Sequence, residues 1–355
     1  AAIRVTATLT APAGWQHGGA LDVTSVDGAT IHYAPTSLEM LIDHPVVLGT
    51  HFRAVTLWPA GSPMGEHVLD VVADSDWALR FPEARIEAYK QVVQQVRAVF
   101  GGVGHYRKYH WLLTLSDTLG SYGVEHHESA DDRVAENTFV DDESAKRSSQ
   151  LLPHEFFHSW NGKALRPAGL VTGGYEQPMR DDLLWVYEGL TNYYGELLAA
   201  RAGLISPQDW FDELAVDAMS VSYPGRTWRP LQDTADAAPF LYVAGGGWTG
   251  WRRQTPDGLP GFYAEGSLLW LEADVTIRRL TGGRKSLDDF CALFHGRNDN
   301  GTMWVRPYEA TDVYQALNAV APFDWKAFFE SRLRSTAPDV PLGGVTGGGY
   351  RLVYT

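Results

Sequence analysis

The stretch Leu151-Leu152-Pro153-His154-Glu155-Phe156-Phe157-His158-Ser159-Trp160-Asn161 decides how the chain is interpreted, because its centre has the pattern His-Glu-x-x-His. This pattern is typical of zinc hydrolases. In a helix, His154 and His158 lie about one turn apart on the same face, where both imidazoles can bind one metal ion. Glu155 then lies beside the ion, where it can take a proton from a bound water. The alternative is a chance match on an ordinary helix, so a third ligand is needed.

The composition is that of a soluble globular protein. Of the 355 residues, 45% are hydrophobic and 20% are charged. The formal net charge of -14, with Lys and Arg scattered along the chain, argues against a nucleic-acid partner. Cys291 is the only cysteine, which leaves His and carboxylate side chains as the strong metal ligands. No apolar run approaches the roughly 18 residues of a membrane-spanning helix, so we expect no transmembrane segment.

Residues 1–75 are expected to form a β-rich N-terminal region. Polar and apolar residues alternate from Ile3 to Thr10, which is the period of a half-buried strand. Further strands are expected at 51–58 and 67–73, with Pro- and Gly-bearing turns between them.

Residues 76–335 are expected to form a mainly helical domain, followed by a Gly/Pro-rich tail at 336–355. Buried strands are expected at Trp111–Leu115 and Asn137–Val140. A long loop at 223–261 contains Trp248 and Trp251, which are candidates for lining a substrate pocket. Apolar periodicity and caps predict helices at 82–100, 183–202, from Ser206 onward, and at 264–280, 286–294, 311–320 and 323–334.

The third ligand is expected from Leu184-Trp185-Val186-Tyr187-Glu188-Gly189-Leu190-Thr191-Asn192-Tyr193-Tyr194, which places one acidic residue in an otherwise apolar helix. Catalytic zinc takes three protein ligands and keeps a fourth position for water. A lone carboxylate is costly to bury unless it is paired or binds a metal, which favours Glu188. The alternative is a glutamate on the solvated face of the helix. Thr191 and Asn192 lie one turn further along, where either can orient a liganding imidazole.

Together these segments resemble the M61 family of zinc metallopeptidases, the glycyl aminopeptidase group. Weaker similarity extends from about Leu38 to Val353. The resemblance implies an α+β fold in which an N-terminal β region precedes a thermolysin-like (gluzincin), mainly helical catalytic domain with a small mixed β-sheet. The matching residues are His154-Glu155-Phe156-Phe157-His158, Trp160-Asn161, Lys163 and Leu184-Trp185-x-x-Glu188-Gly189-x-Thr191-x-Tyr193-Tyr194.

The resemblance also implies a metal site and its base. His154, His158 and Glu188 correspond to the ligands of one Zn²⁺ per chain, and Glu155 corresponds to the general base.

Two further segments resemble substrate-binding parts of the family and its clan. Gly123-Val124-Glu125-His126 matches an edge-strand segment, which implies that Glu125 binds the free α-amine of the substrate and that Gly123 belongs to the same subsite. Tyr263-Ala264-Glu265-Gly266 resembles a segment whose Tyr hydroxyl stabilises the tetrahedral oxyanion. Glu265 stands where that segment has Lys, which is a departure from the pattern.

The resemblance therefore predicts a zinc-dependent aminopeptidase that releases small N-terminal residues, Gly or Ala, from peptides with a free N-terminus. The alternatives are a zinc endopeptidase of the same clan and a catalytically silent peptide-binding relative. An intact Glu155 argues against the silent relative. Family members commonly carry a C-terminal PDZ domain, so we expect this chain to be a fragment or to lack that domain. Export signals are common in the family, which favours a periplasmic or secreted location, and the sequence does not indicate the oligomeric state.

Overall fold

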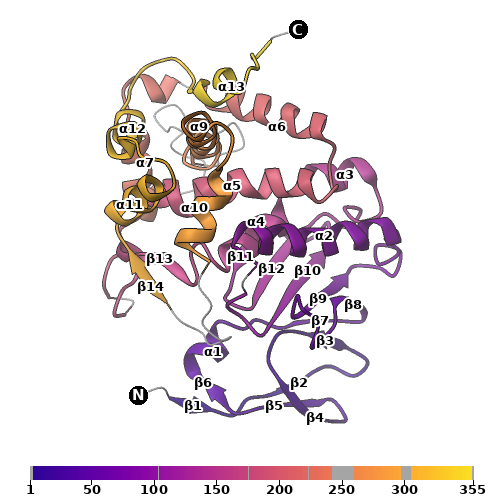
Figure 1. Ribbon diagram of the computed structural model, residues 1–355. Helices are drawn as coiled ribbons and strands as arrows, with labels where there is room; N and C mark the ends of the chain where they lie inside the picture. Colours follow the sequence, from indigo (N-terminus) through magenta and orange to yellow (C-terminus); the bar gives the residue numbers. More distant parts are fainter. Residues whose placement is uncertain are drawn as a thin grey trace.

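Short strands form the N-terminal part of the structure, a computed structural model that describes residues 3–102, 104–174, 176–222, 224–241, 260–296 and 305–353 (Figure 1). The elements of this part are β1 (Arg4–Val5), β2 (Thr8–Thr10), β3 (Gln16–Gly18), β4 (Val23–Asp27), β5 (Thr30–Tyr33), β6 (Thr36–Ser37), α1 (Leu38–Ile42) and β7 (Val47–Gly49). The single strand expected from Ile3 to Thr10 is wrong. It is divided into two strands, because β1 pairs with β6 whereas β2 pairs with β5.

A five-stranded mixed sheet follows in the chain. Its strands are β8 (His51–Trp58), β9 (Glu66–Ala73), β10 (Lys108–Leu115), β11 (Tyr122–Glu125) and β12 (Ser129–Val134). In the order β11-β12-β10-β9-β8, β10 is parallel to both of its neighbours, and the two outer strands are antiparallel to theirs. Because β8 and β9 belong to the same sheet as β10, this sheet crosses the boundary expected near residue 75.

The central strand β10 is buried on both faces. Tyr109 and Trp111 belong to the main hydrophobic core, which the sheet shares with the helices. Leu112 points the other way and packs with Val47 and Val72. A strand that is covered on both sides reads as an apolar run, which is why the sequence predicts it correctly.

The strand expected at Asn137–Val140 is a turn. The carbonyl oxygen of Asn137 accepts hydrogen bonds from the backbone N–H groups of Val140 (3.0 Å) and Asp141 (2.9 Å). The apolar character of this segment has another cause, since the Phe139 ring is buried and stacks on Tyr89 at a centroid distance of 5.4 Å.

Helices cover one face of the mixed sheet (Figure 1). The two helices α2 and α4 lie against the sheet, and α5 packs on both of them. The helices expected from apolar periodicity are all present, and capping boxes begin α6 at Ser206 and α10 at Ser286. The elements are α2 (Glu83–Val99), α3 (Asp142–Arg147), α4 (Leu151–His158), β13 (Leu165–Pro167), η1 (Ala168–Leu170), α5 (Leu184–Arg201), α6 (Pro207–Ser220), η2 (Pro224–Thr227), α7 (Leu231–Asp236), α8 (Ala238–Leu241), α9 (Ala264–Thr281), α10 (Leu287–Phe294), β14 (Arg306–Tyr308), α11 (Ala310–Val320), α12 (Trp325–Leu333) and α13 (Gly343–Gly347).

Helices α5 and α9 touch through two glycines. A Cβ atom added at Gly189 would lie 2.9 Å from the Cα atom of Gly266 and 3.0 Å from the carbonyl oxygen of Phe262. Any side chain at either glycine would force the helices apart. The contact brings the beginning of α9 next to the middle of α5.

The Gly/Pro-rich tail contains a helix that packs on the rest of the molecule. A Cβ atom at Gly344 in α13 would lie 2.7 Å from the backbone nitrogen of Glu272, so the tail is in close contact with α9. Of the helices in the described ranges, none has the length and apolar character that crossing a membrane requires.

Candidate metal centre

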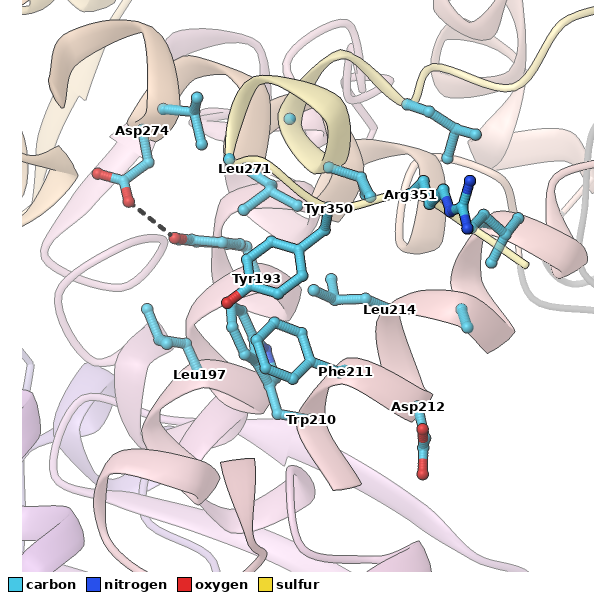
Figure 2. A pocket seen from close by; sticks show the side chains of 18 of the residues that line it. Tyr193, Leu197, Trp210, Phe211, Asp212, Leu214, Leu271, Asp274, Tyr350 and Arg351 are labelled. Carbon is cyan, nitrogen blue, oxygen red and sulfur yellow. Dashed lines mark hydrogen bonds between the residues drawn. The ribbon is translucent and has the colours of Figure 1, made fainter. Parts of the chain in front are cut away.

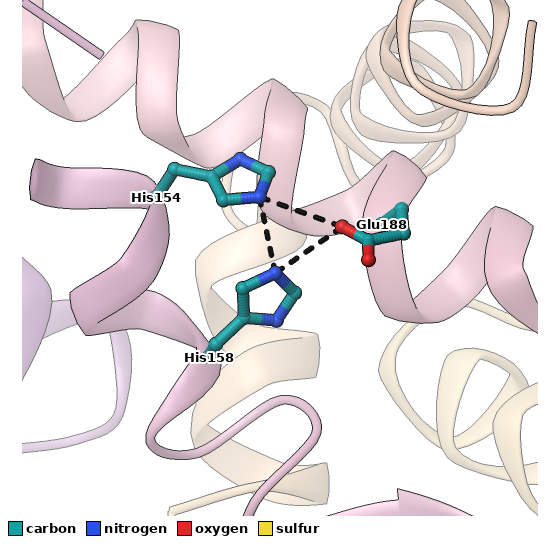
Figure 3. A group of neighbouring side chains, drawn as sticks. All are labelled: His154, His158 and Glu188. Carbon is teal, nitrogen blue, oxygen red and sulfur yellow. Dashed lines mark hydrogen bonds and ion pairs between the residues drawn. The ribbon is translucent and has the colours of Figure 1, made fainter. Parts of the chain in front are cut away.

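Helices α4 and α5 bring together the side chains of His154, His158 and Glu188 (Figure 3). The Nε2 atoms of the two histidines are 3.0 Å apart, and Glu188 Oε2 lies 3.5 Å from His154 Nε2 and 3.2 Å from His158 Nε2. The helices approach closely because residue 195 is glycine, where a Cβ atom would lie 3.0 Å from His154 Cβ. Within the described ranges, these three side chains are the group that could hold a metal ion.

The chemistry of the three donors fits a cation. Glu188 Oε2 is buried and has no hydrogen-bond partner among the described residues. Burial alone would raise the pKa of this carboxyl group, but the neighbouring His158 and His154 outweigh burial and lower the pKa to about 2. The carboxylate is therefore ionised at neutral pH. Two imidazole nitrogens and one carboxylate oxygen are a known ligand set of catalytic zinc.

A hydrogen-bond network holds the His158 ring. Its Nδ1 atom donates to the backbone carbonyl of Asn161 (2.9 Å), and the hydroxyl of Thr191 lies 3.4 Å from the same nitrogen. A carbonyl can only accept, so Nδ1 carries a proton, and Nε2 is the ring nitrogen that remains available for a metal ion. Asn192, the other residue expected to orient an imidazole, instead donates to Glu196 Oε1 (2.8 Å).

Glu155 lies beside His154 and against strand β11. A Cβ atom at Gly123 would lie 2.7 Å from Glu155 Cδ and closer still to Oε1, so the carboxyl group fills the space that glycine leaves. The resemblance places Gly123 in the substrate subsite, and the side chain that approaches it in the structure is that of Glu155. Burial raises the pKa of Glu155 well above its ordinary range, and the charges of Glu125 and Glu188 raise it further.

Glu125, at the end of β11, is half-buried and accepts a hydrogen bond from the Tyr187 hydroxyl. Tyr187 immediately precedes Glu188 in α5, and its ring centroid lies 4.8 Å from that of His158. A side chain on an edge strand and a side chain beside the ligands therefore touch directly.

Tyr263 lies at the start of α9, next to His154, one of the candidate ligands. Its ring centroid is 6.3 Å from that of His154. Glu265 is buried, and its Oε1 atom lies 3.3 Å from Nη1 of Arg226, which is also buried. The substitution of Glu for the expected Lys is thus accompanied by an arginine that balances its charge. Trp248 and Trp251, the candidates for a pocket lining, lie outside the described residues.

Two residues near the site cannot be recognised as such from the sequence patterns. Tyr187 looks like one more aromatic residue of an apolar helix. Asp132 belongs to strand β12 and is completely buried, and neither of its carboxyl oxygens has a hydrogen-bond partner among the described residues. Burial raises the pKa of Asp132 well above its ordinary range, which favours the neutral acid.

A cavity of about 670 Å³ lies between α5, α6, α9 and the C-terminal segment (Figure 2). Trp210, Phe211 and Tyr350 line it, and the hydroxyl of Tyr193 donates to Asp274 (3.2 Å) at its wall. None of the candidate metal, base or amine-binding residues lines this cavity.

Comparison with known proteins gives one family and a group of similar folds. No curated protein sequence matches the chain. A crystal structure of an aminopeptidase N family protein from Idiomarina loihiensis aligns with 97% of this chain at 18% identity and a TM-score of 0.75. An M1 zinc metallopeptidase from Deinococcus radiodurans aligns with 96% of this chain at 14% identity and a TM-score of 0.57, and a mutant of it has been solved with a Tyr-Ser-Ala substrate. The chain spans 57% of the Idiomarina protein and 65% of the Deinococcus protein.

These structures confirm the fold class, which is a mixed α+β fold with an N-terminal β region and a helical domain like those of M1 metallopeptidases. Residues 147–269 match the model of the M61 glycyl aminopeptidase family. That segment contains His154, His158 and Glu188, together with Glu155 and Tyr263. The resemblance of residues 147–269 to the M61 glycyl aminopeptidases is therefore confirmed.

Proposed function

We propose that the protein is a zinc-dependent aminopeptidase with one Zn²⁺ per chain, bound by His154, His158 and Glu188. The observation that carries this proposal is the convergence of two imidazole Nε2 atoms on a buried Glu188 oxygen with no hydrogen-bond partner among the described residues. Such a carboxylate is costly to bury unless a cation compensates its charge.

The reaction is hydrolysis of the first peptide bond. Zinc in this site would polarise the scissile carbonyl and lower the pKa of a bound water. Glu155 takes the proton from the attacking water and passes it to the leaving amine.

Tyr263 and Glu125 bind the two ends of the first substrate residue. The phenol of Tyr263, next to His154, donates a hydrogen bond to the carbonyl oxygen as negative charge develops on it. The Glu125 carboxylate binds the α-ammonium group, so the enzyme acts on peptides with a free N-terminus. From the resemblance to the family we further propose a preference for small first residues, Gly or Ala.

The role of Glu155 is tested by replacing it with glutamine, which has nearly the same shape but accepts no proton. We expect Glu155→Gln to keep its zinc, measured by mass spectrometry of the metal content, and to lose roughly 10²- to 10⁴-fold in kcat. Turnover equal to that of the parent enzyme would remove Glu155 from the mechanism.

The role of Glu125 is tested by the substrate. An alanyl peptide and its N-acetylated form differ only in the ammonium group, so we expect rapid release of alanine from the first and little cleavage of the second. Equal rates would favour an endopeptidase of the same fold.

A further inference from the structure

The Tyr187 side chain connects the proposed amine-binding carboxylate to the metal ligands. Its hydroxyl donates to Glu125 Oε1, and its ring packs on the imidazole of His158. The residue is only 7% exposed. Since Tyr187 also precedes Glu188 in α5, its Cα position is fixed by the same helical turn that carries a ligand.

The phenol ring has little freedom to move. A Cβ atom at Gly162 would lie 2.5 Å from Tyr187 Cζ and 2.7 Å from its hydroxyl oxygen, so the loop after α4 lies against the ring. The backbone carbonyl of Tyr187 accepts hydrogen bonds from the Thr191 hydroxyl (2.6 Å) and from Asn161 Nδ2 (3.2 Å). Tyr187 is thus a rigid donor at a defined place beside the ligands.

Glu125 has the opposite character. It ends a four-residue edge strand and is half-buried, and a glutamate side chain loses considerable rotamer freedom when it is held in one orientation. A donor that already fixes one oxygen of the Glu125 carboxylate lowers the entropic cost of ordering this side chain when the substrate binds.

We propose that Tyr187 is a positioning residue of the amine subsite. Its hydroxyl fixes one oxygen of Glu125, and the rest of the carboxylate faces the α-ammonium group of the peptide. The ammonium nitrogen and the first carbonyl carbon are separated by two covalent bonds, so a carboxylate held at one distance from the ligands selects the first peptide bond. This inference rests on the proposed function, because the binding of the substrate amine by Glu125 is part of that proposal.

The test compares four variants on alanine p-nitroanilide. Tyr187→Phe keeps the ring contacts and removes the donor, and we expect KM to rise about tenfold while kcat changes less than threefold and the zinc content stays the same. Tyr194→Phe is the matched control, because Tyr194 lies on the same helix and donates to the carboxylate of Asp288 (2.8 Å). We expect this control to have the parental KM.

Glu125→Gln and the double variant Glu125→Gln/Tyr187→Phe complete a double-mutant cycle. If Tyr187 acts through Glu125, the second substitution adds less than twofold to the KM of the first. Multiplicative effects of the two substitutions, or an unchanged KM in Tyr187→Phe, would overturn the inference. Should Tyr187→Phe fail to fold, Tyr187→Met, which also lacks the donor, repeats the measurement.

The parent enzyme separates failure of the inference from failure of the proposed function. N-acetylated and free alanyl peptides cleaved at equal rates by the parent enzyme would refute amine recognition altogether. A parent enzyme that prefers the free amine, together with a Tyr187→Phe variant that has the same KM and the same preference, would refute only the role of Tyr187.

Discussion

Replacing Gly123 with alanine moves the proposed base without touching a metal ligand. The new Cβ atom would lie 2.7 Å from Glu155 Cδ and 2.8 Å from Leu151 Cδ1. Since carbon atoms pack at about 3.5 Å, the Glu155 carboxyl group has to retreat by roughly 0.8 Å. A displacement of this size in a catalytic group costs on the order of 100-fold in rate, which corresponds to about 2.7 kcal/mol in the activation barrier.

We therefore expect Gly123→Ala to lower kcat on alanine p-nitroanilide by about 100-fold and to leave the zinc content at the parental value. Gly120→Ala is the control, because a Cβ atom there has no neighbour within 4 Å. If the kcat of Gly123→Ala is within threefold of the parental value, strand β11 shifts to make room for the methyl group and the Glu155 carboxyl group keeps its position. That result would refute the close fit between Gly123 and Glu155 as a determinant of the rate.

Three other substitutions test the metal site, a buried acid and a buried ion pair. Glu188→Ala removes one of three proposed ligands, so we expect it to lose zinc on dialysis, and full occupancy would exclude Glu188 from the ligand set. Burial and the charge of Glu213 raise the pKa of Asp217 from 3.8 to about 8, so the folded state keeps a proton that the unfolded chain releases, and stability falls as pH rises between these values. Asp217→Asn removes that dependence, so its gain in Tm over the parent should be larger at pH 8 than at pH 5, and equal gains would contradict the raised pKa. Glu265→Ala leaves the buried Arg226 guanidinium without its carboxylate, and we expect urea denaturation to show a loss of about 3 kcal/mol in unfolding free energy; a loss below 1 kcal/mol would mean that the backbone carbonyls around Arg226 suffice.

The residues of the candidate metal cluster are predictable because their chemistry conflicts with their surroundings. Two histidines at helical spacing and a lone glutamate in an apolar helix each require an explanation, and the one proposed cation would explain all three. Tyr187 does not conflict with its surroundings, because aromatic residues are common in buried helices. Its partner Glu125 lies 62 positions away in the sequence, and only the fold brings the two together.

The fold is predictable where periodicity and burial agree. Strand β10 and helix α2 follow their patterns closely, whereas the segment Asn137–Val140, which the sequence predicts as a strand, is a turn with a buried Phe139 ring. The pairing of β9 with β10 is also hidden, because the helix α2 separates these two parallel strands in the sequence. Sequence periodicity predicts where a strand lies in the chain, but it does not predict which strand pairs with it in the sheet.

The contact between Gly189 and Gly266 fixes the distance between helices α5 and α9. Glu188 precedes Gly189, and Tyr263 lies three residues before Gly266, so the distance between the proposed ligand and the phenol depends on the contact of two backbones. Substitutions that change the volume of the surrounding core side chains can therefore leave the distance between Glu188 and Tyr263 unaltered. A methyl group at residue 189 or 266 would push the two helices apart, so these two glycines set the distance between Glu188 and Tyr263.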